Sequence, residues 1–333
     1  MKVLNVGFVG TGEVTNIHFE IMKQIPDVCF RSVCGRDTER LGQKQNEWGV
    51  NTYTSITEMV TAENLDIVLI ANENFNHAMD ARLAIEAGAH VLVEKPLDAS
   101  LHLAKELVDF SNSKKKILGV VMQKRFDSNV LKIKKFIENS ALGEIGLARV
   151  DVFMNRSEDY FNSKTWIQDP SKVGGGILLH HAIHSIDVLL WVMISKVILI
   201  SGWTSNQARS MKIEDCGGCW IRFENGATAS IMASVSLHES LKNRLEIFGT
   251  LSSIYLEGTS LRLHPAIGSS AKSDEPHPII SDGDDHKCLW IDYIDAVRNN
   301  RLPIACGASA LKTQIVIDAL YRSASNSRTI NMK

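Results

Sequence analysis

The chain has 333 residues, of which 44% are hydrophobic and 22% are charged, and its formal net charge is −2. A chain of this length exceeds what one hydrophobic core usually serves, so we expect two domains. The near-neutral charge argues against nucleic acid or an anionic membrane surface as a partner, because both require a clustered basic surface. No window approaches the roughly 18 consecutive apolar residues of a membrane-spanning helix. The first apolar run leads into a glycine turn and not into a cleavage site, so we expect no signal peptide.

The first 120 residues alternate short apolar runs with amphipathic stretches. The apolar runs, which are typical of strands buried on both faces of a parallel sheet, cover residues 3–9, 28–34, 67–71, 90–94 and 117–122. The amphipathic stretches, which predict helices, cover residues 15–25, 37–48, 56–61, 76–87 and 100–113. This alternation predicts a doubly wound α/β domain over residues 1–122.

The pattern changes after residue 122. Strand-like runs then follow one another on short links, at residues 197–203, 219–222, 228–236, 244–248 and 253–256. Helical stretches cover residues 129–140, 178–191, 287–299 and 308–326. These elements predict an α+β domain over residues 123–333, with an open, largely antiparallel or mixed sheet. We expect residues 268–285 to form an exposed loop and helix 308–326 to pack back on the first domain.

The glycine-rich turn after the first predicted strand has the pattern of a dinucleotide fingerprint, and it lies between a strand and a helix as that motif requires. We therefore assign residues 1–122 to a dinucleotide-binding Rossmann domain. Gly10 allows a sharp turn. Gly12 allows the backbone to approach a diphosphate, whose charge then meets the free amides of the helix N-terminus. Thr15 replaces the usual third glycine, which implies looser packing of the helix. The candidate cofactor residues of this turn are Gly7, Gly10, Thr11, Gly12, Glu13 and Val14.

The end of the second predicted strand, Cys34-Gly35-Arg36-Asp37, bears on the choice of cofactor. A carboxylate there would bind the adenosine ribose and repel a 2′-phosphate, whereas a small residue followed by arginine accommodates that phosphate. Gly35 takes the carboxylate position and Arg36 follows, so the sequence favours NADP. Asp37 is close enough to the carboxylate position that NAD remains an alternative cofactor.

Glu94-Lys95-Pro96 follows another predicted strand, at the carboxyl edge where such folds bind ligands. Proline keeps Lys95 extended, and a cis peptide bond here would fix the direction of the lysine. Burial lowers the proton affinity of a lysine, which can then act as a general acid or base near neutral pH. A surface lysine at a strand end is the alternative for this tripeptide alone.

Residues 84–97 resemble the signature of the glucose-fructose oxidoreductase, inositol dehydrogenase and MocA-type (Gfo/Idh/MocA) oxidoreductases. The similarity extends over nearly the whole chain, to Ile70-Ala71 and Asn74 through His77, Arg125-Phe126, residues 141–146, the triple glycine 174–176, residues 184–187 and residues 319–324. The resemblance implies a Rossmann domain followed by an α+β domain, with the active site between them. In such proteins the open sheet often supports dimers or tetramers.

The resemblance also implies roles for single residues. Lys95 is the proton-transfer residue, His184 binds or polarises the reacting oxygen, and Asn74 and Glu94 lie near the nicotinamide. The further residues expected at the cofactor are Ala71, Asn72, His77 and Arg125. The chain departs from the family pattern at Asn72-Glu73, where Thr-Pro is usual, at His180, where aspartate or asparagine is common, and at Ala182, which replaces a common glycine. Because of these departures, the resemblance does not identify the substrate or the residue that tunes the proton affinity of Lys95.

His180, His184 and Asp187 have a spacing that would place them on one face of a helix. Two histidines and a carboxylate could ligate a divalent metal. Hydride transfer to nicotinamide needs no metal, however, and the same side chains suit a polyhydroxylated ligand, so we expect none and count His180 among the catalytic residues. The expected substrate contacts are Lys95, Arg125, Arg156, Tyr160, Trp166, His180 and His184, although packing is an equal alternative for Arg156, Tyr160 and Trp166.

The sequence thus predicts an NAD(P)-dependent oxidoreductase that interconverts a secondary alcohol and a ketone on a sugar, sugar derivative or cyclitol. Two alternatives use the same fold. One is a reductase or dehydrogenase of a non-sugar substrate, such as a dihydrodiol or a tetrapyrrole, and the other is a non-catalytic nucleotide-binding regulator. We expect a homodimer or homotetramer. Six scattered cysteines, with a single CxxC at residues 216–219, are typical of a reducing cytosol.

Overall fold

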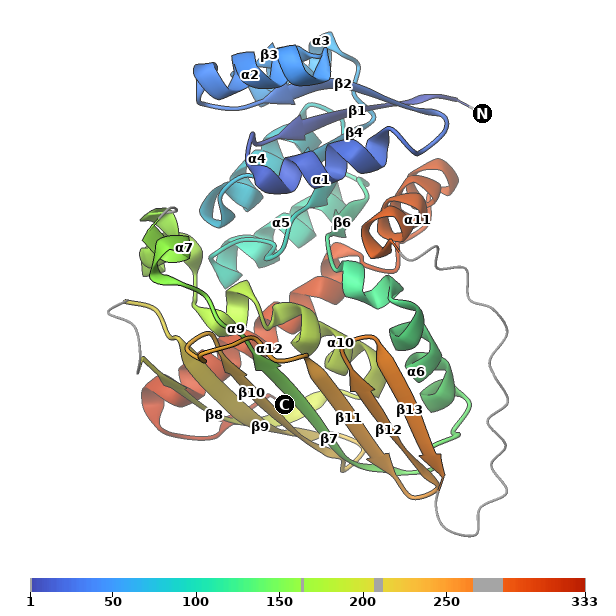
Figure 1. Ribbon diagram of the computed structural model, residues 1–333. Helices are drawn as coiled ribbons and strands as arrows, with labels where there is room; N and C mark the ends of the chain where they lie inside the picture. Colours follow the sequence, from blue (N-terminus) through green and yellow to red (C-terminus); the bar gives the residue numbers. More distant parts are fainter. Residues whose placement is uncertain (1, 163–164, 207–211, 266–283, 333) are drawn as a thin grey trace. The chain divides into compact units, whose positions relative to one another are not determined.

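The computed structural model describes residues 2–162, 165–206, 212–265 and 284–332 (Figure 1). The chain divides into two compact units, and each unit is built from two separate stretches of sequence. The first unit consists of residues 1–123 and 286–311, and the second of residues 124–285 and 312–333. The expected exposed loop at 268–285 lies, up to residue 283, outside the described residues.

The first unit contains a six-stranded parallel sheet with the order β3-β2-β1-β4-β5-β6. Its strands are β1 (Leu4–Val9), β2 (Val28–Cys34), β3 (Asn51–Tyr53), β4 (Ile67–Ile70), β5 (His90–Val93) and β6 (Leu118–Val120). This is the strand order of a Rossmann fold, so the predicted fold class is confirmed. Every residue of β4 is buried, as the continuously apolar run predicts for a central parallel strand.

Helices connect these strands as right-handed crossovers require. They are α1 (Glu13–Met22), α2 (Thr38–Trp48), α3 (Ile56–Ala62), the 3-10 helix η1 (Asn74–Asn76), α4 (His77–Glu86) and α5 (Leu101–Ser113). Ser55 and Ser100 cap α3 and α5 by accepting hydrogen bonds from amides of the first turn. The sequence fixes these starts locally, because a side-chain oxygen satisfies an amide that the helix leaves without a partner.

A segment near the end of the chain returns to the first unit. It consists of α11 (Asp285–Asn299) and the first residues of α12 (Gly307–Asn326). Tyr293 on α11 is buried and donates a hydrogen bond to the carbonyl of Ile117 at 3.1 Å. A Cβ atom on Gly119 would lie 2.6 Å from the Tyr293 ring, so the glycine allows this close approach. The expected single boundary at residue 122 is therefore incorrect, because burial of α11 joins residues 286–311 to the Rossmann sheet.

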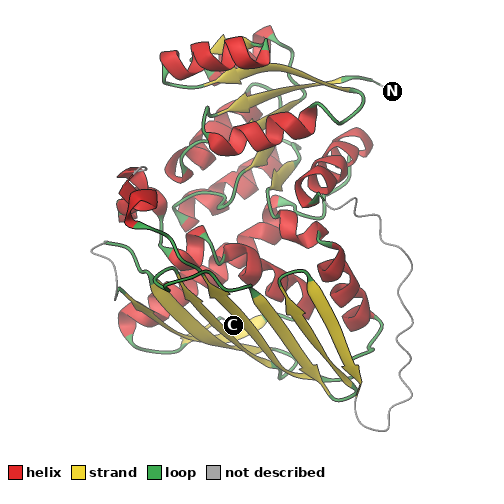
Figure 2. Ribbon diagram, in the orientation of Figure 1, coloured by secondary structure: helices red, strands yellow, loops and turns green. Residues whose placement is uncertain are grey.

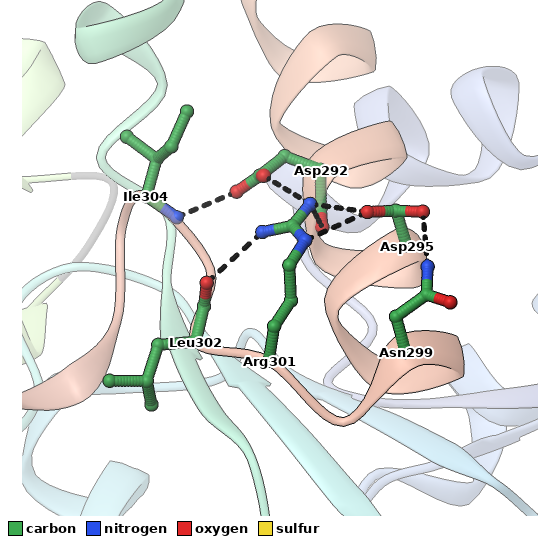
Figure 3. Close-up of polar contacts among 6 residues, drawn as sticks. All are labelled: Asp292, Asp295, Asn299, Arg301, Leu302 and Ile304. Atoms are coloured by element: carbon green, nitrogen blue, oxygen red, sulfur yellow. Dashed lines mark hydrogen bonds and ion pairs between the residues drawn. The ribbon is translucent and has the colours of Figure 1, made fainter.

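A charged cluster closes the turn between α11 and α12 (Figure 3). The Arg301 guanidinium bonds Asp292 at 2.7 Å and Asp295 at 2.8 Å, and it also donates to the Leu302 carbonyl at 3.0 Å. The other carboxylate oxygen of Asp292 accepts the Ile304 amide at 2.7 Å. These bonds hold the returning segment in one conformation before α12 begins.

The second unit contains an eight-stranded sheet with the order β13-β12-β11-β7-β10-β9-β8-β14. Its strands are β7 (Ile145–Phe153), β8 (Val197–Ser205), β9 (Cys216–Phe223), β10 (Thr228–Ser234), β11 (Arg244–Gly249), β12 (Ser252–Glu257), β13 (Ser260–Pro265) and β14 (Ile330–Asn331). All neighbours pair antiparallel except β10 and β7, which are parallel. The predicted open, mixed sheet is confirmed.

Helices cover one face of this sheet, and no helix of the described residues lies on the other (Figure 2). The helices of the second unit are the 3-10 helix η2 (Gln123–Phe126), which begins at the boundary, α6 (Ser128–Glu138), α7 (Glu158–Asn162), the 3-10 helix η3 (Thr165–Gln168), α8 (Pro170–Val173), α9 (Ile177–His180), α10 (Ile183–Met193) and the rest of α12. No single helix of the described residues is long and apolar enough to cross a membrane. The helices Pro170–His180 and Ile183–Met193 reach that length and composition only as a pair, with a bend of 56°.

Candidate active site

The glycine turn of the first unit provides a place for a diphosphate. Gly10 has φ +117°, and a Cβ atom there would lie 2.5 Å from the Ala71 carbonyl oxygen, so no larger residue fits. Gly12 precedes α1 and makes no side-chain cap, and a Cβ atom on it would meet no described atom within 4 Å. Gly12 therefore leaves room for a ligand to approach the first turn of α1. An anionic diphosphate fits there, because helix N-termini attract negative charge.

Thr15 shows how the chain tolerates the loss of the third fingerprint glycine. Its side chain is fully buried, and its hydroxyl donates to the Gly12 carbonyl at 2.5 Å. The expected loosening of the packing is thus offset by an internal hydrogen bond. This bond also fixes the glycine turn against the first turn of α1.

The two charged residues after β2, Arg36 and Asp37, contact different groups. The Asp37 carboxylate caps α2, because one of its oxygens accepts the amides of Glu39 and Arg40, each at 3.1 Å. This role competes with the expected contact to the ribose. The guanidinium of Arg36 forms an ion pair with Glu73, in the loop after β4. The side-chain oxygen of Asn76, in the orientation that satisfies its hydrogen bonds, also accepts from Arg36, at 3.1 and 3.3 Å.

The loop after β4 is tied to the loop after β5 by His77. This side chain is buried, and Nδ1 lies 2.7 Å from the Pro96 carbonyl oxygen, while Nε2 lies 3.2 Å from that of Asn72. Its ring therefore positions two loops, and the expected contact of His77 with the cofactor stays a prediction. Asn74 is also buried, and its carbonyl accepts the Ala99 amide at 3.2 Å.

Lys95 follows β5 directly, at the carboxyl edge of the sheet. The Lys95–Pro96 peptide bond is cis. The lysine is half-buried, and desolvation lowers its pKa, while the negative charge of Glu94 acts in the opposite direction. A lysine with a lowered pKa is suited to exchange a proton with a substrate oxygen. The Lys95 amide donates to Glu94 Oε2 at 3.1 Å, so the two residues hold each other in place.

A buried hydrogen-bond chain supports Glu94. Nε2 of His18 lies 2.9 Å from Glu94 Oε1, and the Trp290 indole N–H donates to His18 Nδ1 at 2.8 Å. Burial alone would raise the pKa of Glu94, but the hydrogen bond from His18 and the nearby charges lower it to about 2. Sequence reasoning missed His18 and Trp290. The only available signal for His18 was its place on the buried face of the predicted helix, with Thr15 and Ile21.

The second unit gathers the predicted substrate residues around His180. Its Nε2 lies 3.3 Å from the Tyr160 hydroxyl, and its ring lies edge-on to that of Trp166 at a centroid distance of 6.2 Å. The guanidinium of Arg156 lies over the Tyr160 ring at 5.4 Å. His181, which we did not expect to participate, packs against His180 with a centroid distance of 4.7 Å. Four predicted residues thus form one polar and aromatic cluster.

The predicted helix 178–191 is broken, so His180, His184 and Asp187 do not share one helix face. α9 ends at His180, and α10 begins only at Ile183. His184 is half-buried in the first turn of α10. Asp187 is buried and bound by other groups, and among the described residues no group of histidine, cysteine and acidic side chains could hold a metal ion.

Asp187 forms a buried ion pair with Arg125. The guanidinium of Arg125 donates from Nε at 2.7 Å and from a terminal nitrogen at 2.6 Å, and the Thr313 hydroxyl adds a bond at 2.7 Å. Arg125 is only 2% exposed. This geometry gives Arg125 a packing role within the second unit. Its expected contact with cofactor or substrate stays a prediction.

The triple glycine precedes α9, the helix that ends at His180, and its last two residues pack against Tyr321 and Glu214. Glu214 accepts hydrogen bonds from the Gly176 amide and from the Tyr321 hydroxyl, both at 2.7 Å, and burial raises its pKa. A Cβ atom on Gly175 would lie 2.2 Å from the Tyr321 hydroxyl, and one on Gly176 would lie 2.0 Å from the Glu214 carbonyl oxygen. Gly175 and Gly176 are therefore required by close packing. Glu214 was not predicted, although the glycine run was a signal for a close approach.

Comparison with known proteins decides the family. Residues 4–122 match the profile of the oxidoreductase family with an NAD-binding Rossmann fold, and residues 130–255 match that of the GFO/IDH/MocA C-terminal domain. The chain belongs to the Gfo/Idh/MocA oxidoreductase family. The resemblance noted in residues 84–97 is thereby confirmed, as is an oxidoreductase activity with an NAD-binding Rossmann domain.

Several relatives in the Gfo/Idh/MocA family are named as dehydrogenases of sugars or cyclitols. The chain is 26% identical to myo-inositol 2-dehydrogenase of Thermotoga maritima, over 76% of this chain and 75% of the relative. It is also 26% identical to levoglucosan dehydrogenase of Pseudarthrobacter phenanthrenivorans, over 76% and 73%. The fold is shared with the WlbA dehydrogenase of Bordetella pertussis, solved with NADH and UDP-GlcNAcA, with a TM-score of 0.90, 24% identity and coverage of 100% and 99%.

Proposed function

We propose that this protein is an NAD(P)-dependent dehydrogenase of a sugar, sugar derivative or cyclitol. The observation that carries the proposal is Lys95, a half-buried lysine with a lowered pKa, held beside Glu94 at the carboxyl edge of the Rossmann sheet. A lysine at this edge has the chemistry needed to move the proton of a secondary alcohol. Relatives named for inositol and levoglucosan support a polyhydroxylated substrate.

In this proposal the residues of the first unit hold the nucleotide and one proton. The uncapped N-terminus of α1 binds the diphosphate, and Asn74 and Glu94 lie near the nicotinamide. The bound cofactor supplies the hydride acceptor or donor at its nicotinamide ring. Lys95 takes the hydroxyl proton of the alcohol in oxidation and returns it in reduction.

The second unit contributes the groups that recognise the sugar. His184 holds the reacting oxygen in line, and the cluster of His180, Tyr160, Trp166 and Arg156 contacts the remaining hydroxyl groups. Hydrogen-bonding side chains with an aromatic surface suit a polyhydroxylated ring better than an apolar substrate such as a tetrapyrrole. His180 combines a hydrogen-bonding ring with contacts to both aromatic side chains, which supports its place at this site.

For the cofactor we propose that NADP is preferred and NAD is also accepted. Arg36 follows Gly35 at the end of β2, where a 2′-phosphate would lie, and a guanidinium suits that group. The capping role of Asp37 supports this proposal, because its carboxylate is engaged away from the ribose. We also propose a homodimer or homotetramer in the cytoplasm, where the thiols of the six cysteines would stay reduced.

The test is a dehydrogenase screen of the purified protein against sugars, sugar derivatives and cyclitols with both cofactors, followed by absorbance of the reduced nicotinamide. We expect turnover of at least one polyol, and we expect Lys95→Ala to abolish it while cofactor affinity is retained. If the variant kept most of the wild-type kcat, Lys95 would not be the proton-transfer group. Activity confined to non-sugar carbonyl compounds would contradict the substrate class.

A further inference from the structure

The ion pair between Arg36 and Glu73 joins the two loops that flank the adenosine end of a Rossmann site. Arg36 follows β2 and Glu73 follows β4, and both strands pair with β1. The carboxyl ends of these parallel strands meet at one edge of the sheet, where ligands bind. The Glu73 carboxylate therefore contacts the same guanidinium that is available for a 2′-phosphate.

The surroundings of this arginine are acidic. Asp80 on α4 is close enough for its charge to interact with both Arg36 and Glu73, and burial raises its pKa. Asn72 donates to Asp80 at 2.5 Å. Asn72 and Glu73 are the two positions where the chain departs from the usual Thr-Pro of the family. Both departures thus act on the electrostatic environment of Arg36.

We propose that Glu73 is a specificity-determining residue that competes with the 2′-phosphate of NADP for Arg36. The inference rests on the proposed NAD(P)-dependent function and deepens it. A 2′-phosphate must displace the Glu73 carboxylate and then lie near a like charge, whereas the neutral 2′-hydroxyl of NAD meets neither obstacle. Glu73 therefore limits the preference for NADP that Arg36 creates and keeps NAD binding competitive.

Loss of this pair should leave the fold intact. The side chains of Arg36 and Glu73 are 64% and 36% exposed, and ion pairs at such positions contribute little to the stability of a fold. Glu73→Gln keeps the size of the side chain and removes its charge. Changes in affinity for the two cofactors can thus be compared without loss of folded protein.

The experiment measures the Kd of NADP⁺ and NAD⁺ by isothermal titration calorimetry for the wild-type protein and Glu73→Gln. We expect the affinity ratio to move toward NADP⁺ by roughly three- to tenfold, with little change for NAD⁺, and we expect added salt to reduce the difference. Glu86→Gln is the matched control. It removes an exposed carboxylate that pairs with Arg82 on α4, at 3.3 Å, and it should leave the ratio unchanged.

Two results would contradict the proposal that Glu73 competes with the 2′-phosphate for Arg36. One is a ratio of NADP⁺ to NAD⁺ affinity that is the same in Glu73→Gln as in Glu86→Gln. The other is an undiminished effect of Glu73→Gln in a protein that already carries Arg36→Ala, because no guanidinium would then be left to compete for. If the wild-type protein bound neither nucleotide, the proposed function itself would fail and this inference with it. If instead both nucleotides bound and their affinity ratio were unchanged, only the inference about Glu73 would fail.

Discussion

His18 and Glu94 are joined by a buried hydrogen bond of 2.9 Å, and the indole N–H of Trp290 determines which ring nitrogen of His18 carries the proton. The Trp290 N–H donates to His18 Nδ1, which must therefore be an acceptor. The proton of the ring lies on Nε2 and is donated to Glu94. His18 thereby orients the Glu94 carboxylate and its negative charge. That charge then acts on Lys95, the next residue.

Replacing Glu94 by Gln should make Lys95 easier to deprotonate. The carboxylate, with a pKa of about 2, is charged at any working pH and raises the pKa of Lys95 against the effect of burial. The groups that face Glu94 are His18, Lys95 and His286. Without the negative charge of Glu94, burial lowers the pKa of Lys95 further. The acidic limb of kcat/KM for alcohol oxidation, where Lys95 must be neutral, should move to lower pH.

The same change can be measured without a substrate. Labelling of Lys95 by an amine-reactive reagent, quantified by mass spectrometry as a function of pH, follows the neutral amine. Each unit by which the pKa falls should speed labelling about tenfold while the lysine is mostly protonated. The exposed Lys23 in the same digest is an internal reference. Unchanged labelling of Lys95 in folded Glu94→Gln would show that the two groups are not coupled.

Trp290→Phe should destabilise the first unit. The substitution keeps an aromatic ring and removes the N–H, so the buried Nδ1 of His18 loses its donor. An unpaired buried acceptor costs about 1–3 kcal/mol, which should appear as a lower free energy of unfolding in urea. Met79→Leu is the control, because Met79 is 61% exposed on α4 of the same unit and its substitution should change little. Equal stability of the two variants would contradict the hydrogen-bond chain.

Local patterns were sufficient for most of the fold. The apolar runs and the glycine turn identify five of the six Rossmann strands, and only the three-residue β3 is too short to stand out. The central strand β7 was missed. Its pattern is interrupted by Arg149 and Asp151, and a buried Asp151, 2% exposed, is paired with that arginine in a way that sequence alone does not reveal.

The site was predictable where a motif is local and unpredictable where its partners are distant. Lys95, Gly10 and Gly12 follow from short motifs. By contrast, Trp290 lies 272 residues from His18, and Thr313 lies 126 residues from Asp187, so neither bond leaves a pattern along the chain. The break between α9 and α10 was missed because residues 177–193 contain no proline or glycine, so the sequence gives no stop signal at the break.

Asp187→Asn should destabilise the second unit by about 3–5 kcal/mol, the usual cost of breaking a buried ion pair on one side. The amide would meet three donors, from Arg125 and Thr313, with only one oxygen to accept them. Urea unfolding measures the change. Asp318→Asn, which breaks an exposed pair with Arg322, should cost less than about 1 kcal/mol. A stable Asp187→Asn protein with weakened cofactor binding would instead favour a ligand-binding role for Arg125.

The open face of the second sheet should hold two copies of the protein together. Its centre is apolar, with Trp220, Met232 and Trp203 exposed by 62%, 43% and 41%. Charges of both signs flank this centre, including Arg149 and Glu246 on neighbouring strands. A patch with an apolar centre and both charges can be self-complementary about a two-fold axis.

Trp220→Glu should therefore lower the mass of the particle in solution, because it buries a charge at the centre of the proposed contact. Light scattering coupled to size exclusion should give a dimer or tetramer for the wild-type protein and a smaller species for the variant. Ile291→Glu is the matched control, since Ile291 is 48% exposed on α11 of the other unit and its substitution should leave the mass unchanged. A monomeric wild-type protein at micromolar concentration would contradict a homo-oligomer. An unchanged mass for Trp220→Glu would instead place the contact on another surface, because no oligomer can bury an unpaired charge at its centre without loss of affinity.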